Sequence, residues 1–368
     1  MSKIYGLIGC GMMGAEHIRN LSLLEGASVG CVYDPIAEQA HFGASLAGDA
    51  YIARSIEDLI ARPDLDAIII ASPNNLHIDQ LETIAKHRTI PVLCEKPLFT
   101  ERSDIQRIRR LEANYPAPIW VAMEYRYMPP IAAFLEQVDS ATGGIKMLTL
   151  QEHRFPFLDK IGHWNRFNRN TGGTFVEKCC HFFDLMRLIL KSEPVSVSAT
   201  AGQMANHLDE NYGGQPPDIW DGGYAIFDFE NGARALLELS MVADGSTWNE
   251  KIHAIGPSGM MECRVPGPQR FWPKGLGPSP QPQLELSPRD PKRPEIYDIE
   301  LEDALTEAGD HHGSTFFQHL KFLEMVHVGG RPDVTLDDGL RAVVMGLNTQ
   351  IAAAEKRFVT FDSMRVPA

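Results

Sequence analysis

Two residues that could move a proton lie four apart inside an apolar run. The run is "GTFVEKCCHFFDL" (residues 173–185), and it contains Glu177 and His181. Residues four apart on a helix share one face, so we expect the two side chains to stack. A carboxylate beside an imidazole fixes its tautomer and favours its charged form. Such a histidine can accept the proton of a substrate hydroxyl, which predicts acid–base chemistry here.

Other interpretations of this run stay open. Glu177 and His181 could be an ion pair that holds the helix to a loop. They could also bind a metal together with nearby Cys or His, but no closed ligand set of known spacing is present, and we expect no metal. Cys179 and Cys180 are expected to be small core residues rather than nucleophiles.

A glycine-rich turn near the start of the chain has the context of a dinucleotide site. The strand pattern "KIYGLIGCG" runs into Gly9-Cys10-Gly11-Met12-Met13-Gly14, a helix pattern follows, and a second strand ends at Asp34. The order of strand, Gly-x-Gly-x-x-Gly, helix, strand and acid is that of a dinucleotide-binding unit. A 2′-phosphate would face the Asp34 carboxylate, and "DPIAEQA" offers no Arg or Lys, so NAD is preferred over NADP.

The α/β alternation continues, and polar residues follow two of the later strands. One group comes after "DAIIIASP" and the other after "PVLCEKP". Ligands of open parallel sheets bind at these carboxyl ends. The expected cofactor contacts are therefore Gly9, Gly11, Met12, Met13, Gly14, Asp34, Ser72, Pro73, Asn74, His77, Glu95 and Lys96.

The glycine turn, "ASPNNLH" and "CEKP" together resemble the Gfo/Idh/MocA oxidoreductases. The resemblance implies that Lys96 is catalytic and that the Lys96-Pro97 peptide is cis. It also implies a second signature, in which an Asp, a His and an Asp follow a Gly-Gly turn. This chain has Glu177 in place of the first Asp, which puts the reach of that carboxylate in doubt. With Lys96, the implied catalytic residues are His181 and Glu177, and the substrate contacts are Arg126, Trp164, Arg166, Asp184 and His181.

The pattern of elements predicts two domains. Residues 1–123 form an α/β Rossmann domain. Residues 124–368 form an α+β domain with a large, mostly antiparallel open sheet, since Asn231-Gly232 marks one hairpin. The resemblance implies that the open face of this sheet makes a homodimer or homotetramer. The Pro-rich stretch 264–310 is expected to be a long excursion without core structure.

Composition excludes several classes of function. The 368 residues carry a formal net charge of −14, which disfavours nucleic acid and anionic membranes as partners. No apolar run is long enough to span a membrane. Six cysteines without disulfide spacing favour a reducing, cytoplasmic setting.

We therefore expect an NAD-dependent dehydrogenase that acts on a secondary hydroxyl of a sugar, cyclitol or related polyol. One alternative is an enzyme that holds NAD tightly for transient oxidation, in epimerisation or glycosidic cleavage. Another is a dinucleotide sensor without catalysis. Two roles remain open for "DHHGST" (310–315): Ser314 could cap the helix that follows, or the segment could complete the pocket.

Overall fold

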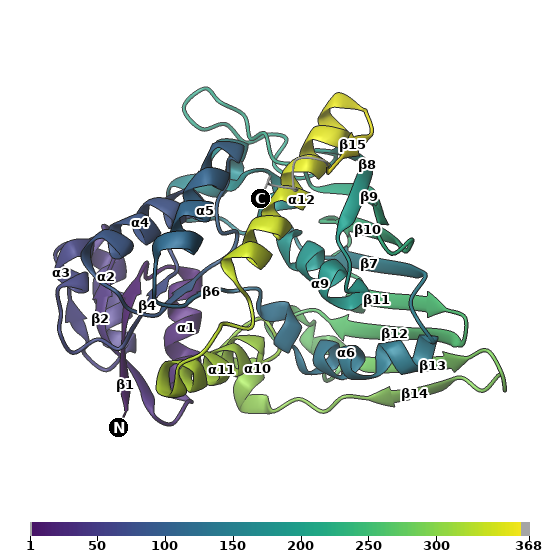
Figure 1. Cartoon of the computed structure of the whole chain (residues 1–368), viewed down its shortest axis with the longest axis horizontal. Coiled ribbons are helices and arrows are strands. Elements are labelled where there is room, and N and C mark those ends of the chain that lie inside the picture. The colour runs from purple at the N-terminus through teal and green to yellow at the C-terminus, as the bar shows by residue number, and fades with distance from the viewer. Residues whose placement is uncertain (1, 362–368) are drawn as a thin grey trace.

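The computed structural model describes residues 2–361, and its first part is a six-stranded parallel sheet flanked by helices (Figure 1). The strand order is β3-β2-β1-β4-β5-β6, so the direction of winding changes between β1 and β4. Burial on both faces explains the unbroken apolar β4. The strands are β1 (Lys3–Ile8), β2 (Ala27–Tyr33), β3 (Tyr51–Ile52), β4 (Ala67–Ile70), β5 (Val92–Cys94) and β6 (Ile119–Val121). The helices are α1 (Met12–Ser22), α2 (Ala37–Leu46), α3 (Ile56–Ile60), α4 (His77–His87) and α5 (Ile105–Asn114).

The second part is a nine-stranded sheet in the order β14-β13-β12-β11-β7-β10-β9-β8-β15. All neighbouring strands are antiparallel except β7 and β10. The strands are β7 (Met147–His153), β8 (Pro194–Gly202), β9 (Gly222–Phe229), β10 (Arg234–Ser240), β11 (Trp248–Gly256), β12 (Gly259–Pro266), β13 (Gln283–Pro288), β14 (Glu295–Asp298) and β15 (Val359–Thr360). The helices are α6 (Pro129–Thr142), α7 (Asn168–Thr171), α8 (Thr174–Glu177), α9 (Cys180–Leu190), α10 (Asp303–Ala308), α11 (Ser314–Val328) and α12 (Leu336–Glu355).

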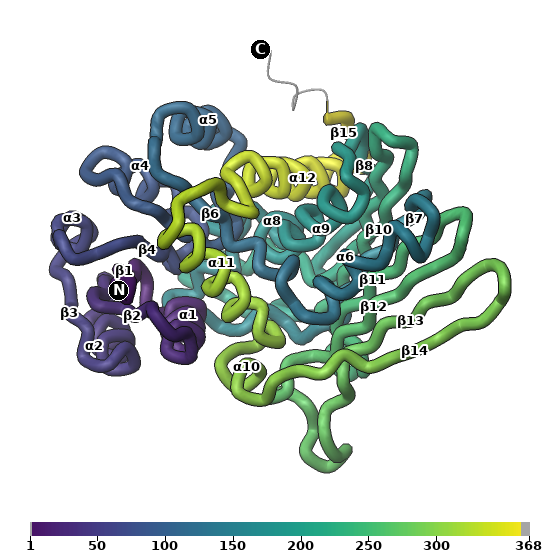
Figure 2. Tube along the Cα trace, turned by 60° about the horizontal axis from the view of Figure 1, so that its bottom comes forward, coloured from purple at the N-terminus to yellow at the C-terminus, as the bar shows by residue number. Residues whose placement is uncertain are grey.

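Two C-terminal helices join the parts. α12 begins at a capping box made by Thr335 and Asp338, and it contacts α5 and β6 as well as α8, α9 and β8. α11 packs on α1 and on the short 3-10 turn η3 (Glu124–Tyr127). Figure 2 shows both helices lying between the two sheets. Through these contacts, α12 packs against elements of both parts of the chain, and α11 packs against the first part and the turn that follows it.

Two local expectations were wrong. The helix expected to carry Glu177 and His181 is broken: α8 ends at Glu177, and α9 begins at Cys180. The stretch 264–310 is not without core structure, because β13 pairs with β12, and Leu284 is fully buried. Of the two roles left open for residues 310–315, capping by Ser314 is not found, because the N-cap of α11 is Gly313 and no side chain caps it.

One face of the nine-stranded sheet carries no helix (Figure 1). Its apolar side chains lie in the open, with Met147 55%, Tyr224 51% and Ile226 54% exposed. No helix within residues 2–361 is long and apolar enough to cross a membrane.

Candidate active site

A cavity of about 540 Å³ runs from the glycine turn to the strand ends of the first sheet and on to the second part of the chain. Ligand sites in open parallel sheets lie at such a winding change. The cavity wall brings together most of the residues expected to contact a cofactor, and it adds five residues from the second part. The expected residues on the wall are Gly9, Gly11, Met12, Met13, Asp34, Ser72, Pro73, Asn74, Glu95 and Lys96, and those from the second part are Asp159, Lys160, Ile161, Trp164 and Glu177.

The glycine turn has the shape that a pyrophosphate needs. Gly9 has φ +94°, and a Cβ there would lie 2.7 Å from the backbone of Ala71 and Ser72. A Cβ on Gly14 would lie 2.1 Å from the Gly9 carbonyl oxygen, so this residue allows α1 to pack close to β1. Around Gly11 there is open space. The turn therefore leaves room for phosphates against the backbone N–H groups at the start of α1.

Asp34 lies at the end of β2 on the cavity wall. Its Oδ2 accepts a hydrogen bond from Cys10 N at 2.8 Å, and its Oδ1 accepts one from Ile36 N at 2.9 Å. These bonds hold the carboxylate beside the glycine turn, where the ribose of a dinucleotide would lie.

His77, which we expected to contact the cofactor, does not line the cavity. Its ring lies between two strand-end turns, with Nε2 2.9 Å from the Ser72 carbonyl oxygen and Nδ1 2.8 Å from that of Pro97. Burial lowers the pKa of His77, so the ring is neutral and donates to one of these oxygens at a time. His77 positions the two turns rather than a ligand.

Lys96 follows β5, and the Lys96-Pro97 peptide is cis, as the resemblance implied. Its Nζ donates to the backbone oxygen of Glu177 at 3.2 Å. Burial acts to lower the pKa of Lys96. Three neighbouring acidic groups act to raise it: the ionised Cys180 thiol and the carboxylates of Glu95 and Glu177. Overall, the pKa of Lys96 is raised. Lys96 is therefore a charged donor at the wall of the cavity.

A buried chain of hydrogen bonds supports the Lys96 turn from behind. Glu95 Oε2 accepts from Lys96 N at 3.1 Å, and Glu95 Oε1 lies 3.0 Å from His17 Nε2. His17 Nδ1 in turn lies 2.9 Å from Nε2 of His319 on α11. Burial acts against the charge of His17, but the hydrogen bond and charge of Glu95 raise its pKa overall. The chain links α11 to the turn that carries Lys96.

His181 lies behind the cavity wall and is 2% exposed. Its Nδ1 is buried without a hydrogen-bond partner among the described residues. Burial lowers the pKa of His181 well below its usual 6.5, and the charges of Lys96 and Lys178 lower it further. We expected Glu177 to favour the charged form. This was wrong, because the break between α8 and α9 leaves no hydrogen bond between the two within residues 2–361, while cations surround the ring.

Glu177 itself lines the cavity, and its Oε2 is buried without a hydrogen-bond partner in the described chain. Burial raises the pKa of this carboxyl, while Lys96 and Lys160 act to lower it. Glu177 therefore faces the cavity as a group free to bind a ligand.

The four residues expected to contact substrate besides His181 are not brought together. Trp164 lines the cavity. The Arg126 guanidinium forms a two-pronged ion pair with Asp184, and Arg126 lies at a separate hollow beside Asp338. Arg166 Nε donates to Glu210 Oε2 at 2.9 Å. Three of these side chains are thus committed to ion pairs within the protein.

Sequence reasoning missed three residues near the site. Tyr125 stacks on His181, and Lys178 is a hydrogen-bond donor to the Tyr125 hydroxyl and pairs with Glu152 at 2.8 Å. Lys160 lines the cavity beside Trp164. Lys160 lies in the irregular stretch after β7, and this position was only a weak sign in the sequence of a place at the site. The only sign for Tyr125 was that it precedes Arg126.

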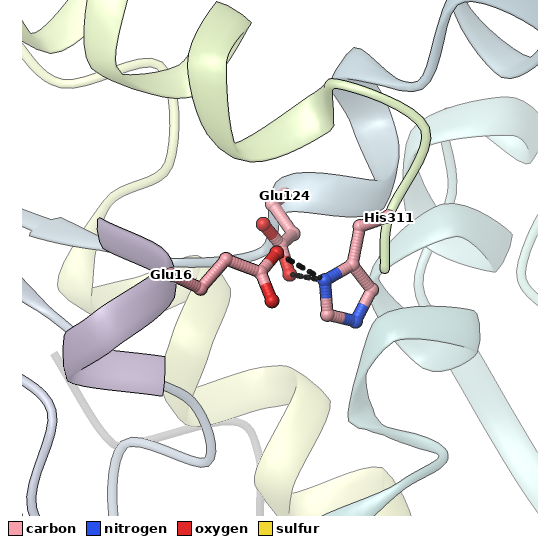
Figure 3. A group of neighbouring side chains, drawn as sticks. All are labelled: Glu16, Glu124 and His311. Carbon is pink, nitrogen blue, oxygen red and sulfur yellow. Dashed lines mark hydrogen bonds and ion pairs between the residues drawn. The ribbon is translucent and has the colours of Figure 1, made fainter. Parts of the chain in front are cut away.

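His311 directs one ring nitrogen toward two neighbouring carboxylates, those of Glu16 and Glu124 (Figure 3). Its Nδ1 is 2.8 Å from Glu16 Oε1 and 3.3 Å from Glu124 Oε1, and the Thr315 hydroxyl lies within hydrogen-bonding distance of both carboxylates and donates to one of them at a time. Three atoms that could ligate a metal lie within 4.8 Å of one another here. Burial opposes the charge of His311, but Glu124 and Glu16 raise its pKa to about 9. The ring is therefore protonated near neutral pH, and the group is an ion-pair cluster between α1, η3 and α11.

Two family models cover almost all of the described chain. The model described as an oxidoreductase family with an NAD-binding Rossmann fold matches residues 3–123. The model of the same family's C-terminal α/β domain matches residues 137–361. Residues 124–136 lie between the two matches.

Several known proteins are similar over most of their length. Inositol 2-dehydrogenase of Rhizobium meliloti is 27% identical over 262 residues, covering 70% of this chain and 74% of that protein. Myo-inositol 2-dehydrogenase of Thermotoga maritima is 23% identical over 98% of both chains. The crystal structure of an oxidoreductase from Agrobacterium radiobacter, solved with NAD⁺, L-tartaric acid and magnesium, has a TM-score of 0.81 at 19% identity and covers 99% of this chain and all of that one.

Proposed function

This chain belongs to the Gfo/Idh/MocA family of oxidoreductases and has the NAD-binding Rossmann fold of that family, and from this premise we propose that it is an NAD-dependent dehydrogenase of a sugar, cyclitol or related polyol. The similarity to two inositol 2-dehydrogenases supports a polyol substrate. One observation carries the proposal: a charged lysine, Lys96, lies on the same cavity wall as the glycine turn and Asp34.

NAD fits the residues present. The open space at Gly11 suits the pyrophosphate, and the fixed Asp34 carboxylate suits a ribose with a free 2′-hydroxyl. Asp34 also disfavours a 2′-phosphate, which supports NAD over NADP. When bound, NAD supplies the hydride acceptor.

The chain's own residues handle the substrate hydroxyl. Lys96 donates a hydrogen bond to the hydroxyl oxygen and holds it at the cavity wall. His181, neutral because of its lowered pKa, is the base that finally receives the hydroxyl proton as the carbon is oxidised to a carbonyl. Because His181 does not line the cavity, the proton reaches it by a relay in which Lys96 passes on one proton and takes up that of the hydroxyl. Glu177 and Trp164 bind the remaining hydroxyls and the apolar face of the polyol. Lys178, tied to Glu152 and Tyr125, keeps the stacked Tyr125 ring against His181.

A panel of polyols, sugars and sugar acids, each with NAD or NADP and followed by nicotinamide absorbance, tests this function. Steady NADH formation with one of them supports a dehydrogenase. NAD that stays bound to the protein during purification under native conditions, with no release of NADH, would support transient oxidation instead. Reversible NAD binding without turnover of any substrate would support a sensor.

We also propose that the protein forms a homodimer or homotetramer through the open face of the nine-stranded sheet. Met147 pairs with Ile255 across β7 and β11, and Ile226 pairs with Leu236 across β9 and β10, so this face carries two cross-strand apolar pairs. Exposed apolar patches of this kind mark protein interfaces. The six cysteines are all buried and free, which supports our proposal of a cytoplasmic location.

A further inference from the structure

Lys160 is a cation without an anionic partner on the wall of the cavity. It lies at the end next to Trp164 and Glu177, and its Nζ is 6.0 Å from the centre of the Trp164 ring. Within residues 2–361, its ammonium makes no ion pair and no hydrogen bond to a side chain. Burial lowers the pKa of Lys160, so its charge is held at a cost that a bound anion would offset.

Arg154 is a second cation whose hydrogen-bonding capacity is not used. Its Nη1 is 3.8 Å from Glu152 Oε1, beyond hydrogen-bonding distance, and that carboxylate already pairs with Lys178 at 2.8 Å. Arg154 Nε is buried without a partner in the described chain. Arg154 does not line the cavity itself, but its charge acts on Lys160 and Glu177, which do, and on His181.

Two further charged groups near this end have partners. Asp159 lines the cavity next to Lys160, but its carboxylate bonds His163 at 2.7 Å. Arg166 is paired with Glu210. Glu177 lies at this end too and acts on Lys160, but within residues 2–361 it forms no ion pair with that ammonium, and burial raises the pKa of its carboxyl. The two cations Lys160 and Arg154 therefore outnumber the one unpaired carboxylate where the part of a substrate beyond its reacting carbon would lie.

Resting on the proposed function, we propose that the substrate carries a carboxylate, as an aldonic or uronic acid does, and that Lys160 binds it with support from Arg154. A carboxylate matches one free ammonium and one partly free guanidinium. Phosphate sites in proteins gather more donors, often at a helix N-terminus, than this wall offers. A neutral cyclitol would leave both cations unpaired.

Matched substrates test the inference. Gluconate and sorbitol differ only in a carboxylate against a hydroxymethyl group, and glucuronate and glucose form a second pair. For the wild type with NAD, we expect kcat/KM to be higher for the acid of a pair by about tenfold or more. In Lys160→Met, which keeps the apolar stem, we expect this ratio to fall toward one, mainly through KM of the acid. The exposed Lys86, at the end of α4, provides the control variant Lys86→Met, which keeps the wild-type ratio.

Binding is measured alongside turnover, by titrating each acid and its neutral partner into the enzyme with NADH. Tighter binding of the acid that is lost in Lys160→Met supports the inference even for a pair that is not oxidised. Equal or better use of the neutral member, an unchanged ratio in Lys160→Met, or preference for glucose 6-phosphate over glucuronate would overturn it. NADH formation with neutral polyols alone would leave the proposed dehydrogenase standing, whereas no NADH with any polyol or acid would remove it.

Discussion

The ring of His181 lies flat on the ring of Tyr125, with centroids 4.0 Å apart and planes 7° from parallel. Tyr125 comes from η3, and Lys178 fixes its hydroxyl. The stack holds the imidazole plane, which in other sites is held by a hydrogen bond from the imidazole N–H to a carboxylate. Because the aromatic ring brings no negative charge, the pKa of His181 is set by burial first and then by the cations around it.

Replacement of the base should slow oxidation without loss of fold. We expect His181→Asn to lower kcat by about 10²–10⁴ with NAD affinity near that of the wild type. The measurement is steady-state kinetics together with NAD titration. Because the pKa of His181 lies below 6.5, the wild-type rate should fall only at pH values under 6.5, and this limb should be absent in the variant. A limb well above pH 6.5, or full activity in His181→Asn, would contradict its role.

The matched change at the proposed donor is Lys96→Met. It removes the charge at the cavity wall, so we expect kcat to fall by about 10² or more, while the glycine turn and Asp34 still bind NAD. Rates and NAD titrations are compared with Lys86→Met, which removes a lysine charge away from the cavity. If Lys96→Met turns over substrate at the wild-type rate, the lysine has no part in the chemistry.

Cofactor preference should depend on Asp34. In Asp34→Ser with Pro35→Arg, we expect NAD affinity to fall by about tenfold and NADP affinity to rise, since the repelling carboxylate is gone and a cation is added. Fluorescence titration with both dinucleotides measures this. Asp34 also accepts from Cys10 N and Ile36 N, so the melting temperature is followed as a control. Wild-type protein that binds NADP as tightly as NAD would refute the assignment.

The ion-pair cluster at His311 should make stability depend on pH. Its folded pKa of about 9 lies above the usual 6.5, so its contribution is complete below pH 6.5 and is lost as pH rises through 9. A second buried group, Glu250, also titrates in the folded protein. Burial first, and then the charge of Glu152, raise the pKa of Glu250 to about 7, so the stability that its protonated form contributes is largely lost by about pH 7. Between pH 7 and 9, the free energy of unfolding should therefore fall in the wild type and stay flatter in His311→Gln.

The exposed His87 at the end of α4 supplies the control His87→Gln, which should keep the wild-type pH dependence. Denaturant melts at several pH values measure all three proteins. Parallel curves for the wild type and His311→Gln between pH 7 and 9 would show that the ring is not protonated in the folded protein.

The open sheet face should hold the oligomer together. We expect Tyr224→Glu combined with Ile226→Asp to shift the molar mass in light scattering to that of a monomer, because the two charges would be buried in the contact. Val328→Asp, which alters an exposed residue at the end of α11, should leave the mass unchanged. A wild-type protein that is already monomeric would refute this interface.

The sequence by itself determined the cofactor half of the site. Gly9, Gly11, Asp34 and Lys96 each follow a strand, and the carboxyl ends of parallel strands meet at one edge of a sheet whatever the details of packing. Their approximate places therefore follow from local patterns of apolar strands and turns. The two-domain order and the hairpins follow in the same way.

Only the tertiary structure decided which charges remain free. Arg126 and Asp184 lie 58 residues apart and neutralise each other, while Lys160 remains unpaired on the cavity wall. The same structure broke the helix between Glu177 and His181 and placed Tyr125 on the ring instead. The pKa and the partner of a side chain depend on its burial and on charges brought close from distant parts of the chain, and spacing along the sequence carries no record of either.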